Sequence, residues 1–392
     1  MSITQPRAHH LTKAFIRLDH LTHNLRLLQA RVGEVPLWPV LKANAYGHGA
    51  ELIAAHLVRL GYTTVCVADV DEAIALAEAG IHVTCIVLSA SLPQQSEALV
   101  AYRCEPVVCT LEMVEALARA ADIAGHGVAV HVNVDTGMGR IGIQPQEVQS
   151  FLDRCLDFPA LWVRGLMSHF PRADEEDKSY SLAQLARFRA VATTTHPYGI
   201  AVRHIANSAA ILDLPGSAFD AVRPGIAIYG LPPSSHIANP RVHDLKPVLE
   251  WKTRITFLKE VPPGTGLSYG HAFHTTHPSL IATIPIGYGD GLHRQLSNQL
   301  DVLVQGVRCP QVGRITMDMS MVDVTAVRGK VALGDEVVII GEQGTEEVTA
   351  DELAGKLGTI NYEVVTGISH RVPRVITDAD SNESRRERHR SG

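Results

Sequence analysis

Through the first 230 residues, short runs of apolar or β-branched residues alternate with longer stretches whose apolar positions repeat at helical spacing. The runs predict strands over 35–42, 63–68, 82–88, 105–109, 128–134, 161–168, 202–205 and 221–229. The stretches predict helices over 20–32, 49–60, 70–79, 94–102, 111–124, 145–156, 177–195 and 207–213. This alternation is typical of an α/β fold whose parallel strands close into a TIM-like (β/α)8 barrel. An open, doubly wound sheet is the alternative, but no Gly-x-Gly-x-x-Gly turn follows the first strand.

After about residue 231 the helical spacing largely disappears, and a Pro/Ser-rich stretch over 231–235 predicts a linker. Short alternating segments separated by Gly and Pro then predict strands over 250–261, 280–286, 301–307, 319–324 and 336–340, with one helix near 349–357. We therefore expect a barrel domain over 1–244 and a mostly β C-terminal domain over 245–378. The remaining residues, 379–392, carry no apolar period and predict a disordered tail.

Composition narrows the class of protein. Hydrophobic residues make up 46% of the 392 and charged residues 19%, as in a packed globular protein. The net charge of −6 disfavours a nucleic-acid partner, and the absence of an apolar run of about 18 residues disfavours a membrane-spanning helix. The N-terminus lacks the apolar core of a secretory signal, and the six cysteines show neither CxxC nor metal-ligand spacing. These features predict a cytoplasmic protein with reduced thiols and no metal.

Chemically active side chains follow several of the predicted strands. Lys42 ends the first, 135–140 follows the fifth, His169 the sixth, 207–208 the seventh and 223–226 the eighth. In a barrel of this kind, the loops at the carboxyl ends of the strands carry the chemistry, and the last loops commonly bind phosphate. The set, with one lysine, two arginines and one histidine, suits a phosphorylated ligand and an amine nucleophile.

Lys42 has two interpretations from its position alone. Most lysines lie on the surface, and Lys42 could be one of them. It also ends the apolar run 35–41, so its stem would emerge in the mouth of the barrel. A lysine held there among other cations would have a lowered pKa and could form a Schiff base.

Nine motifs, in this order, resemble those of the bacterial alanine racemases between about residues 14 and 376. They are VLKANAYGHG, VDTGMGRIG, SHF, NSAA, VRPGIAIYG, GLSYG, GYGDG, TMDM and INYEVVTGISHRVPR. Any one motif is a weak signal, but the ordered set with its spacing is specific. The resemblance implies a homodimeric pyridoxal 5′-phosphate enzyme that interconverts L- and D-alanine, supplying D-alanine for peptidoglycan or acting in alanine catabolism.

By this resemblance, Lys42 holds the cofactor as an internal aldimine and later acts as one of two catalytic bases. The resemblance also implies a set of residues on the phosphate side of the cofactor: Tyr46, Asn207, Ser208, Gly225, Ile226 and Tyr362. Arg223 matches the partner of the pyridine nitrogen, and His169 matches a histidine stacked near the ring. Because a guanidinium cannot accept a proton, the ring nitrogen should stay unprotonated, which would limit transamination.

Racemisation needs proton transfer on both faces of the α-carbon, so two bases are expected. The resemblance implies that Tyr269, from the other subunit, is the second base. It also implies that Met317 and Asp318 of that subunit line the pocket, and that Arg140 contacts the substrate carboxylate and the ring oxygen. Tyr288 is expected to narrow the entrance together with the tyrosine of the INYE motif.

The chain departs from the family at two positions. Many members have a carbamylated lysine where this chain has Asn133, so an anion such as chloride, or water, is expected beside Arg140. Thr316 replaces a frequent cysteine. A racemase of broader range, or one preferring serine, is the alternative function. A pyridoxal-dependent decarboxylase and a non-catalytic pyridoxal-phosphate carrier are less consistent with the GLSYG motif and the long C-terminal β region.

Overall fold

The computed structural model describes residues 9–377. The tail predicted over 379–392 lies outside the described residues. Contacts divide the chain into two compact units. The first, here called the barrel unit, comprises Leu21–Ala45 and Gly49–Lys246. The second, here called the β unit, comprises Pro247 onward together with Tyr46–His48 and the residues up to His20.

Six parallel strands form the wall of the barrel unit, in the order in which they occur in the chain. They are β2 (Thr64–Val67), β3 (Thr84–Val87), β4 (Glu105–Val108), β5 (Val128–Asn133), β6 (Leu161–Met167) and β7 (Val202–His204). Each lies within a predicted strand. Most of their side chains are buried, as expected of parallel strands covered on both faces, although Trp162 of β6 is exposed.

Two extended segments close the ring where the sequence predicted regular strands over 35–42 and 221–229. Trp38 N donates to Val222 O at 2.8 Å, which joins the two segments. Leu41 N donates to Cys66 O at 2.7 Å, which joins the first segment to β2. Arg223 N donates to Ala206 O at 2.9 Å just beyond β7. The predicted barrel is confirmed.

The prediction of regular strands in these two segments is wrong, because the structure contains only isolated bridges there. Proline explains the irregularity: Pro36, Pro39 and Pro224 lack the N–H that a ladder requires. Each segment therefore contributes scattered hydrogen bonds rather than a continuous strand.

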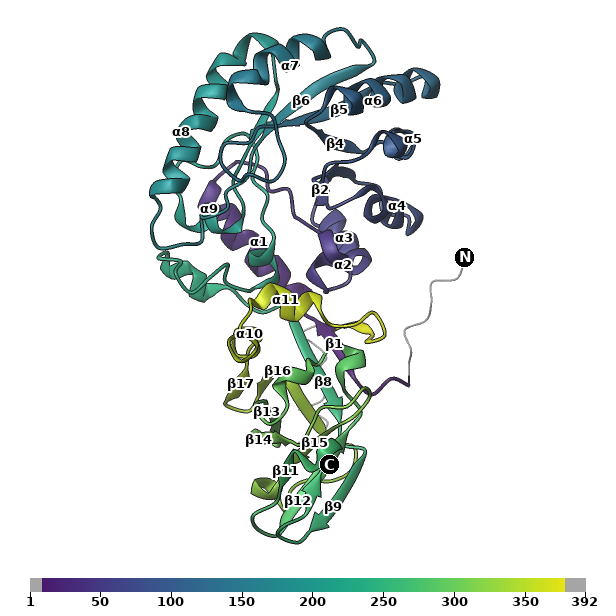
Figure 1. Ribbon diagram of the computed structural model, residues 1–392, viewed down its shortest axis with the longest axis vertical. Coiled ribbons are helices and arrows are strands. Elements are labelled where there is room, and N and C mark those ends of the chain that lie inside the picture. Colours follow the sequence, from purple (N-terminus) through teal and green to yellow (C-terminus); the bar gives the residue numbers. More distant parts are fainter. Residues whose placement is uncertain (1–8, 378–392) are drawn as a thin grey trace. The chain divides into compact units, whose positions relative to one another are not determined.

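Helices cover the outside of the parallel sheet, and Figure 1 shows α4 to α8 in this position. The helices of the barrel are α1 (Leu18–Val32), α3 (Ala50–Arg59), α4 (Val70–Glu78), α5 (Ser96–Ala101), α6 (Leu111–Ala124), α7 (Val148–Cys155), α8 (Ser179–Thr194) and α9 (Ser208–Asp213). Helix α6 illustrates their local causes. The Thr110 side chain accepts from Met113 N at the start, and Gly125, at φ 71°, ends the helix.

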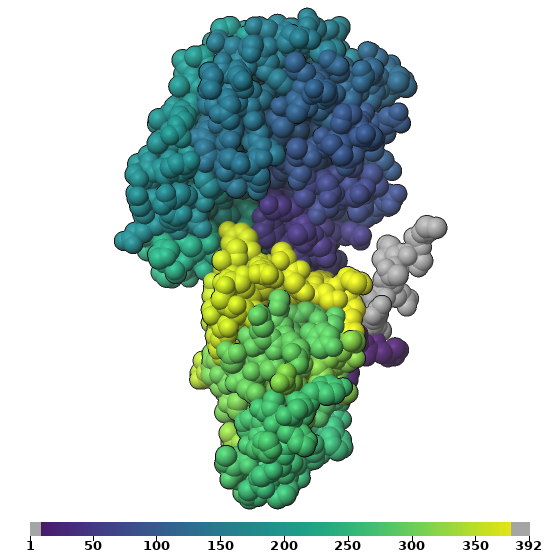
Figure 2. All heavy atoms as spheres, viewed as in Figure 1, coloured from purple at the N-terminus to yellow at the C-terminus, as the bar shows by residue number. Residues whose placement is uncertain are grey.

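The β unit contains a ten-stranded sheet in the order β18-β1-β8-β16-β13-β14-β15-β12-β9, with β17 paired to β16. A separate hairpin is formed by β10 and β11. The strands are β1 (Lys13–Ile16), β8 (Leu249–Arg254), β9 (Phe257–Val261), β10 (Gly266–Leu267), β11 (Phe273–His274), β12 (Ser279–Ile284), β13 (Asp301–Val304), β14 (Val307–Val312), β15 (Ser320–Asp323), β16 (Glu336–Gln343), β17 (Glu346–Val348) and β18 (Arg374–Ile376). Helices α10 (Ala350–Leu357) and α11 (Asn361–Thr366) lie at the surface of this unit and are yellow in Figure 2. The mostly β prediction is confirmed.

Strand β1 was not predicted. It comes from the start of the chain, yet it lies inside the large sheet, where Phe15 pairs with Glu250 of β8 and with Val375 of β18. Elsewhere in the β unit, the predicted strand over 250–261 is divided into β8 and β9.

Across residues 9–377, none of the helices has the length and apolar character needed to span a bilayer. The six cysteines are free thiols, and five of them are buried.

Candidate active site

Lys42 begins a left-handed turn at the carboxyl end of the first barrel segment. The next four residues, Ala43 to Tyr46, have φ angles between 52° and 54°. A non-glycine residue in this conformation costs roughly 1–2 kcal/mol, so four in succession require outside support. Gly47 follows at φ 81°, and a Cβ there would lie 2.1 Å from Val365 O. The backbone after Lys42 is therefore strained and closely packed.

Glu72 supplies part of the support. One carboxylate oxygen accepts from Ala43 N at 2.6 Å, and the other accepts from Ala68 N at 2.7 Å. This side chain, on α4, thus joins the left-handed turn to the residue that follows β2. Burial raises the pKa of the Glu72 carboxyl, although both backbone hydrogen bonds favour its ionised form.

Replacing Glu72 with glutamine tests this support. A glutamine has one acceptor oxygen, so either Ala43 N or Ala68 N would lose its partner. We expect Glu72→Gln to lower the free energy of unfolding by about 1–3 kcal/mol, measured by urea denaturation of the holoenzyme. Glu78→Gln, at an exposed position of the same helix, is the control and should change it by less than about 0.5 kcal/mol. Equal effects of the two substitutions would contradict the assignment.

Two arginines, Arg140 and Arg223, lie near the Lys42 amine. Burial lowers the pKa of Lys42, and the nearby charges of Arg140 and Arg223 lower it further, while Glu72 opposes them. His169 belongs to the same group: burial, followed by Arg223, Arg140 and Lys42, lowers its pKa to about 3. His169 is therefore a neutral imidazole at physiological pH. The structure brings together these four residues, which the sequence had selected at separate strand ends.

A set of short polar contacts lies between the start of α9 and the segment after Arg223. The Ser208 hydroxyl accepts from Gly225 N at 2.8 Å and from Ala227 N at 3.3 Å. Asn207 caps α9, with its side-chain oxygen accepting from Ala210 N at 3.0 Å. Ile226 is buried at the start of a 3-10 turn, Ile226–Tyr229. The predicted phosphate-side residues of the barrel unit are therefore neighbours.

The two tyrosines predicted for the phosphate side lie together within the β unit. The rings of Tyr46 and Tyr362 are 6.0 Å apart between centroids. Tyr46 is buried and Tyr362 is half-buried.

Arg223 is only 3% exposed and is held by acceptors of the barrel interior. Its guanidinium donates to Ser168 O at 2.7 Å and to Nδ1 of His204. Sequence reasoning missed His204 and the buried polar residues beyond it, His131 and Glu105. A signal was available, because His131 stands within the apolar strand β5 and Glu105 begins the apolar strand β4.

Tyr269 lies in the β unit and is 72% exposed. It begins a short 3-10 turn, Tyr269–His271. Its two neighbours in the chain have positive φ angles, 63° at Ser268 and 66° at Gly270. The Ser268 hydroxyl donates to Arg314 O at 2.6 Å, and a Cβ at Gly313 would lie 2.8 Å from the Ser268 Cβ. The phenol therefore projects into solvent from a tightly packed support.

Tyr288, Met317 and Asp318 form a second cluster in the β unit. Tyr288 N donates to Thr316 O at 3.0 Å, and Gly289 N donates to Met317 O at 2.9 Å. All three side chains are exposed. Arg371, which the sequence did not single out, donates to the carboxylates of Asp290 and Asp318 and so ties the two loops together.

Asn133 ends β5 and is 5% exposed. Its side-chain amide donates to Ile141 O at 3.2 Å, on the loop that carries Arg140. The expected anion beside Arg140 stays a prediction.

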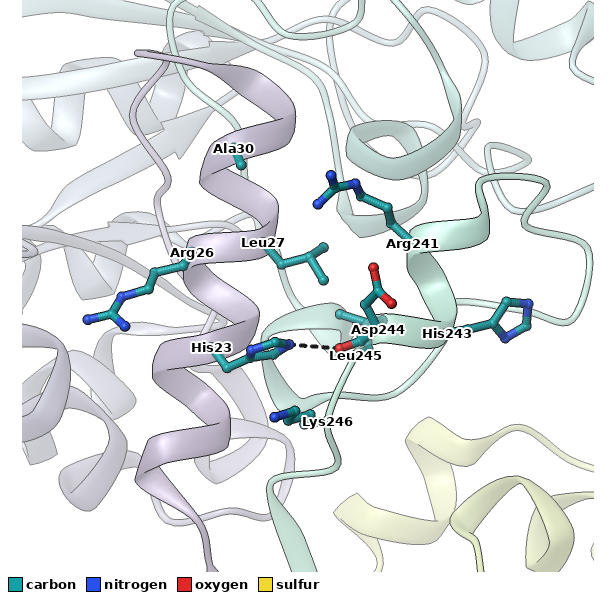
Figure 3. A pocket seen from close by; sticks show the side chains of 9 residues that line it. All are labelled: His23, Arg26, Leu27, Ala30, Arg241, His243, Asp244, Leu245 and Lys246. Atoms are coloured by element: carbon teal, nitrogen blue, oxygen red, sulfur yellow. Dashed lines mark hydrogen bonds between the residues drawn. The ribbon is translucent and has the colours of Figure 1, made fainter. Parts of the chain in front are cut away.

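A separate cleft of about 530 Å³ lies in the barrel unit between α1 and the residues around Arg241 (Figure 3). His23 Nε2 bonds to Asp244 O at 2.8 Å across it. Its lining also includes Arg26, Arg241 and Lys246. None of the residues predicted for the active site lines this cleft. We therefore assign the chemistry to the strand ends.

Fold and site together define a barrel enzyme with a lysine near two arginines at the carboxyl ends of the strands, followed by a strained left-handed turn. The family model "Alanine racemase, N-terminal domain" matches residues 16–233, and "Alanine racemase, C-terminal domain" matches residues 248–376. The chain belongs to the alanine racemase family, whose members are isomerases.

Sequence similarity to other alanine racemases extends over nearly the full chain. The chain is 46% identical over 375 residues to an alanine racemase of Halothermothrix orenii, covering 95% of this chain and 97% of that one. It is 43% identical over 368 residues to one of Desulfovibrio desulfuricans, covering 93% and 98% respectively. The solved alanine racemase of Clostridium difficile 630 is 36% identical, with a TM-score of 0.89 and 97% coverage of both chains.

Proposed function

We propose that this isomerase interconverts L- and D-alanine with pyridoxal 5′-phosphate bound at Lys42. The observation that carries the proposal is the placement of the partly buried Lys42 amine near Arg140 and Arg223, which lowers its pKa. An amine with a lowered pKa is more often neutral, and a neutral amine is the form that condenses with an aldehyde.

The residues around Lys42 fit the chemistry of that cofactor. Arg140 and Arg223 supply positive charge for an anionic ligand, and Ser208 with Asn207, Gly225 and Ile226 supplies small polar groups and backbone N–H. Arg223 can only donate hydrogen bonds, so it suits an unprotonated pyridine nitrogen. Tyr46 and Tyr362 would hold the phosphate side, and neutral His169 would lie beside the ring.

When bound, pyridoxal phosphate withdraws electrons and so acidifies the α-hydrogen of an attached amino acid. Lys42 would remove or return the proton on one face of the α-carbon. The Tyr269 phenol would do so on the other face. Arg140 and the Met317 N–H would orient the substrate carboxylate, while Tyr288 and Tyr362 would narrow the entrance and disfavour large side chains.

The assembly that follows is a homodimer with two shared sites. The 72% exposure of Tyr269 supports this part of the proposal, because a catalytic phenol must be enclosed when it acts. Tyr269, Met317 and Asp318 of one copy would complete the site of the other. We accordingly assign most of the cofactor binding to residues 1–244; residues 245–378 would add Tyr362 and contribute to the partner's site. Buried, free cysteines support a cytoplasmic location.

Borohydride reduction of the holoenzyme, followed by peptide mapping, tests the proposal. We expect the reduced cofactor on Lys42 and interconversion of the enantiomers of alanine faster than those of serine, lysine or arginine. Protein stripped of cofactor and treated identically is the control and should carry no label. Label on another lysine, or a clear preference for serine, would contradict the proposal.

A further inference from the structure

Five residues from adjacent segments of the barrel wall form a continuous polar chain in its interior. Arg164 of β6 donates to one oxygen of Glu105 in β4, and the other Glu105 oxygen bonds to His131 Nε2 of β5 at 2.9 Å. His131 Nδ1 bonds to His204 Nε2 of β7 at 2.9 Å. His204 Nδ1 in turn bonds to Arg223, at the proposed cofactor site. We call these residues the Arg164–Arg223 chain.

Arg223, at one end, fixes the proton on each imidazole of this set of residues. Arg223 has no acceptor, so His204 Nδ1 must accept, and the proton of a neutral His204 is then on Nε2. His204 Nε2 therefore donates to His131 Nδ1, which places the proton of a neutral His131 on its own Nε2. That N–H donates to Glu105, whose two oxygens accept from His131 and Arg164.

Burial and charge are consistent with these protonation states. His131 and His204 are fully buried. Burial lowers the pKa of both imidazoles, and Arg223 lowers that of His204 further. Burial alone would raise the pKa of Glu105, but the hydrogen bond from His131 and the charge of Arg164 lower it. Two neutral imidazole rings, those of His131 and His204, therefore lie between the Glu105 carboxylate and the Arg223 guanidinium.

The surrounding residues are shaped for this arrangement. Gly165 lies opposite His131 in the sheet, and a Cβ there would lie 2.0 Å from His131 Nδ1. Trp38 packs edge-on against both rings, with centroids 5.9 Å from His131 and 5.0 Å from His204. The glycine makes room for the contact, and the indole, only 6% exposed, covers it.

We propose that Glu105, His131 and His204 are positioning residues: by fixing the tautomer of His204, they hold the Arg223 guanidinium in place as an obligate donor toward the cofactor ring. With the tautomers reversed, His204 would present an N–H to Arg223, and two donors would face each other. Arg223 would then shift, and the ring nitrogen would be freer to take a proton. This inference rests on the proposed function, because it assumes that Arg223 faces the ring.

The isosteric substitution Glu105→Gln tests the inference, because both partners of Glu105 donate. If the glutamine oxygen stays with Arg164, its NH2 faces His131 Nε2 and reverses both tautomers. In the double variant Glu105→Gln/Arg164→Met, the glutamine is free to turn its oxygen toward His131. This orientation restores the wild-type tautomers of both histidines. Arg164→Met alone leaves the carboxylate in place and should behave as wild type.

Two measurements on the four holoenzymes are compared. The 15N NMR spectrum of labelled histidine reports which ring nitrogen carries the proton. Turnover with L-alanine is followed together with pyruvate release, in which the amino group passes to the cofactor, giving pyridoxamine phosphate, and water supplies the pyruvate oxygen. We expect reversed tautomers in Glu105→Gln only, with kcat lowered about tenfold, KM little changed and pyruvate per racemisation raised about tenfold.

Wild-type protein with a proton on Nδ1 of His131 or His204 would overturn the inference without any variant. Reversed tautomers in Glu105→Gln with unchanged kcat and unchanged pyruvate would also overturn it. Both results leave the proposed function intact, whereas a wild-type holoenzyme without racemase activity refutes the proposed function itself.

Discussion

Two inactive variants of this chain are expected to form one working site when they are paired. Lys42→Ala and Tyr269→Phe should each lower racemisation by about 10³-fold or more, because each lacks one of the two proposed bases. In a heterodimer of the two, one shared site carries both substitutions and lacks both bases, but the other contains the native pair. Isolated through two different affinity tags, this heterodimer should show about half the wild-type activity per dimer.

The matched control puts both substitutions in one chain. A heterodimer of the wild-type chain with the Lys42→Ala/Tyr269→Phe chain carries the same substitutions in total, yet each shared site then lacks one base. It should be inactive. If each chain instead supplied both bases to its own site, the two heterodimers would exchange results. Both assays use the same tags and the same cofactor concentration.

A large loss of stability is expected in the β unit from Arg371→Met. Asp290 is 1% exposed, and Arg371 donates to both of its oxygens, at 2.8 and 3.1 Å. Removal of the guanidinium would leave a buried carboxylate without its ionic partner. We expect the free energy of unfolding to fall by about 3 kcal/mol, near the lower end for a broken buried pair because Arg371 is partly exposed. Urea denaturation at fixed protein and cofactor concentration measures it.

Arg308→Met is the control for this prediction. Arg308 also pairs with two carboxylates, those of Glu346 and Glu352, but both are partly exposed to solvent. Its loss should cost less than about 1 kcal/mol. Arg371→Met should additionally raise KM for alanine, since Arg371 also holds Asp318 at 2.7 Å in the proposed substrate pocket. If Arg371→Met lowered the free energy of unfolding no more than Arg308→Met does, the assignment would be contradicted.

Local patterns predicted much of the fold, because most barrel strands and helices are defined by neighbouring residues. Apolar runs found β2 to β7, and helical spacing found the helices between them. Pro36, Pro39 and Pro224 indicate irregular segments, because proline lacks the N–H that a strand ladder requires. The apolar runs around them nevertheless led to a prediction of regular strands. Strand β1 could not be found in this way, because its four residues form a strand only by pairing with β8 and β18, far along the chain.

The candidate site was predictable where the chemistry follows a strand end or a motif. Lys42, His169 and Arg223 were selected on these grounds, and the structure brings them together. The left-handed turn after Lys42 was not foreseen, because Ala43 is not a residue that favours it and the support comes from Glu72, on another segment. The polar chain behind Arg223 depends on which side chains face the same interior, a property of the closed barrel rather than of any one strand.

The position of β1 makes the barrel an insertion within the β unit, which bears on how the protein is synthesised. Strand β1 (Lys13–Ile16) is synthesised before the barrel. Its pairing partners, β8 and β18, are synthesised after the barrel. The barrel can condense during translation, but the large sheet of the β unit is complete only after β18, Arg374–Ile376, has been made. A truncated fragment starting at Pro247 would expose the edges of β8 and β18 and is expected to aggregate unless a peptide corresponding to β1 is added in trans.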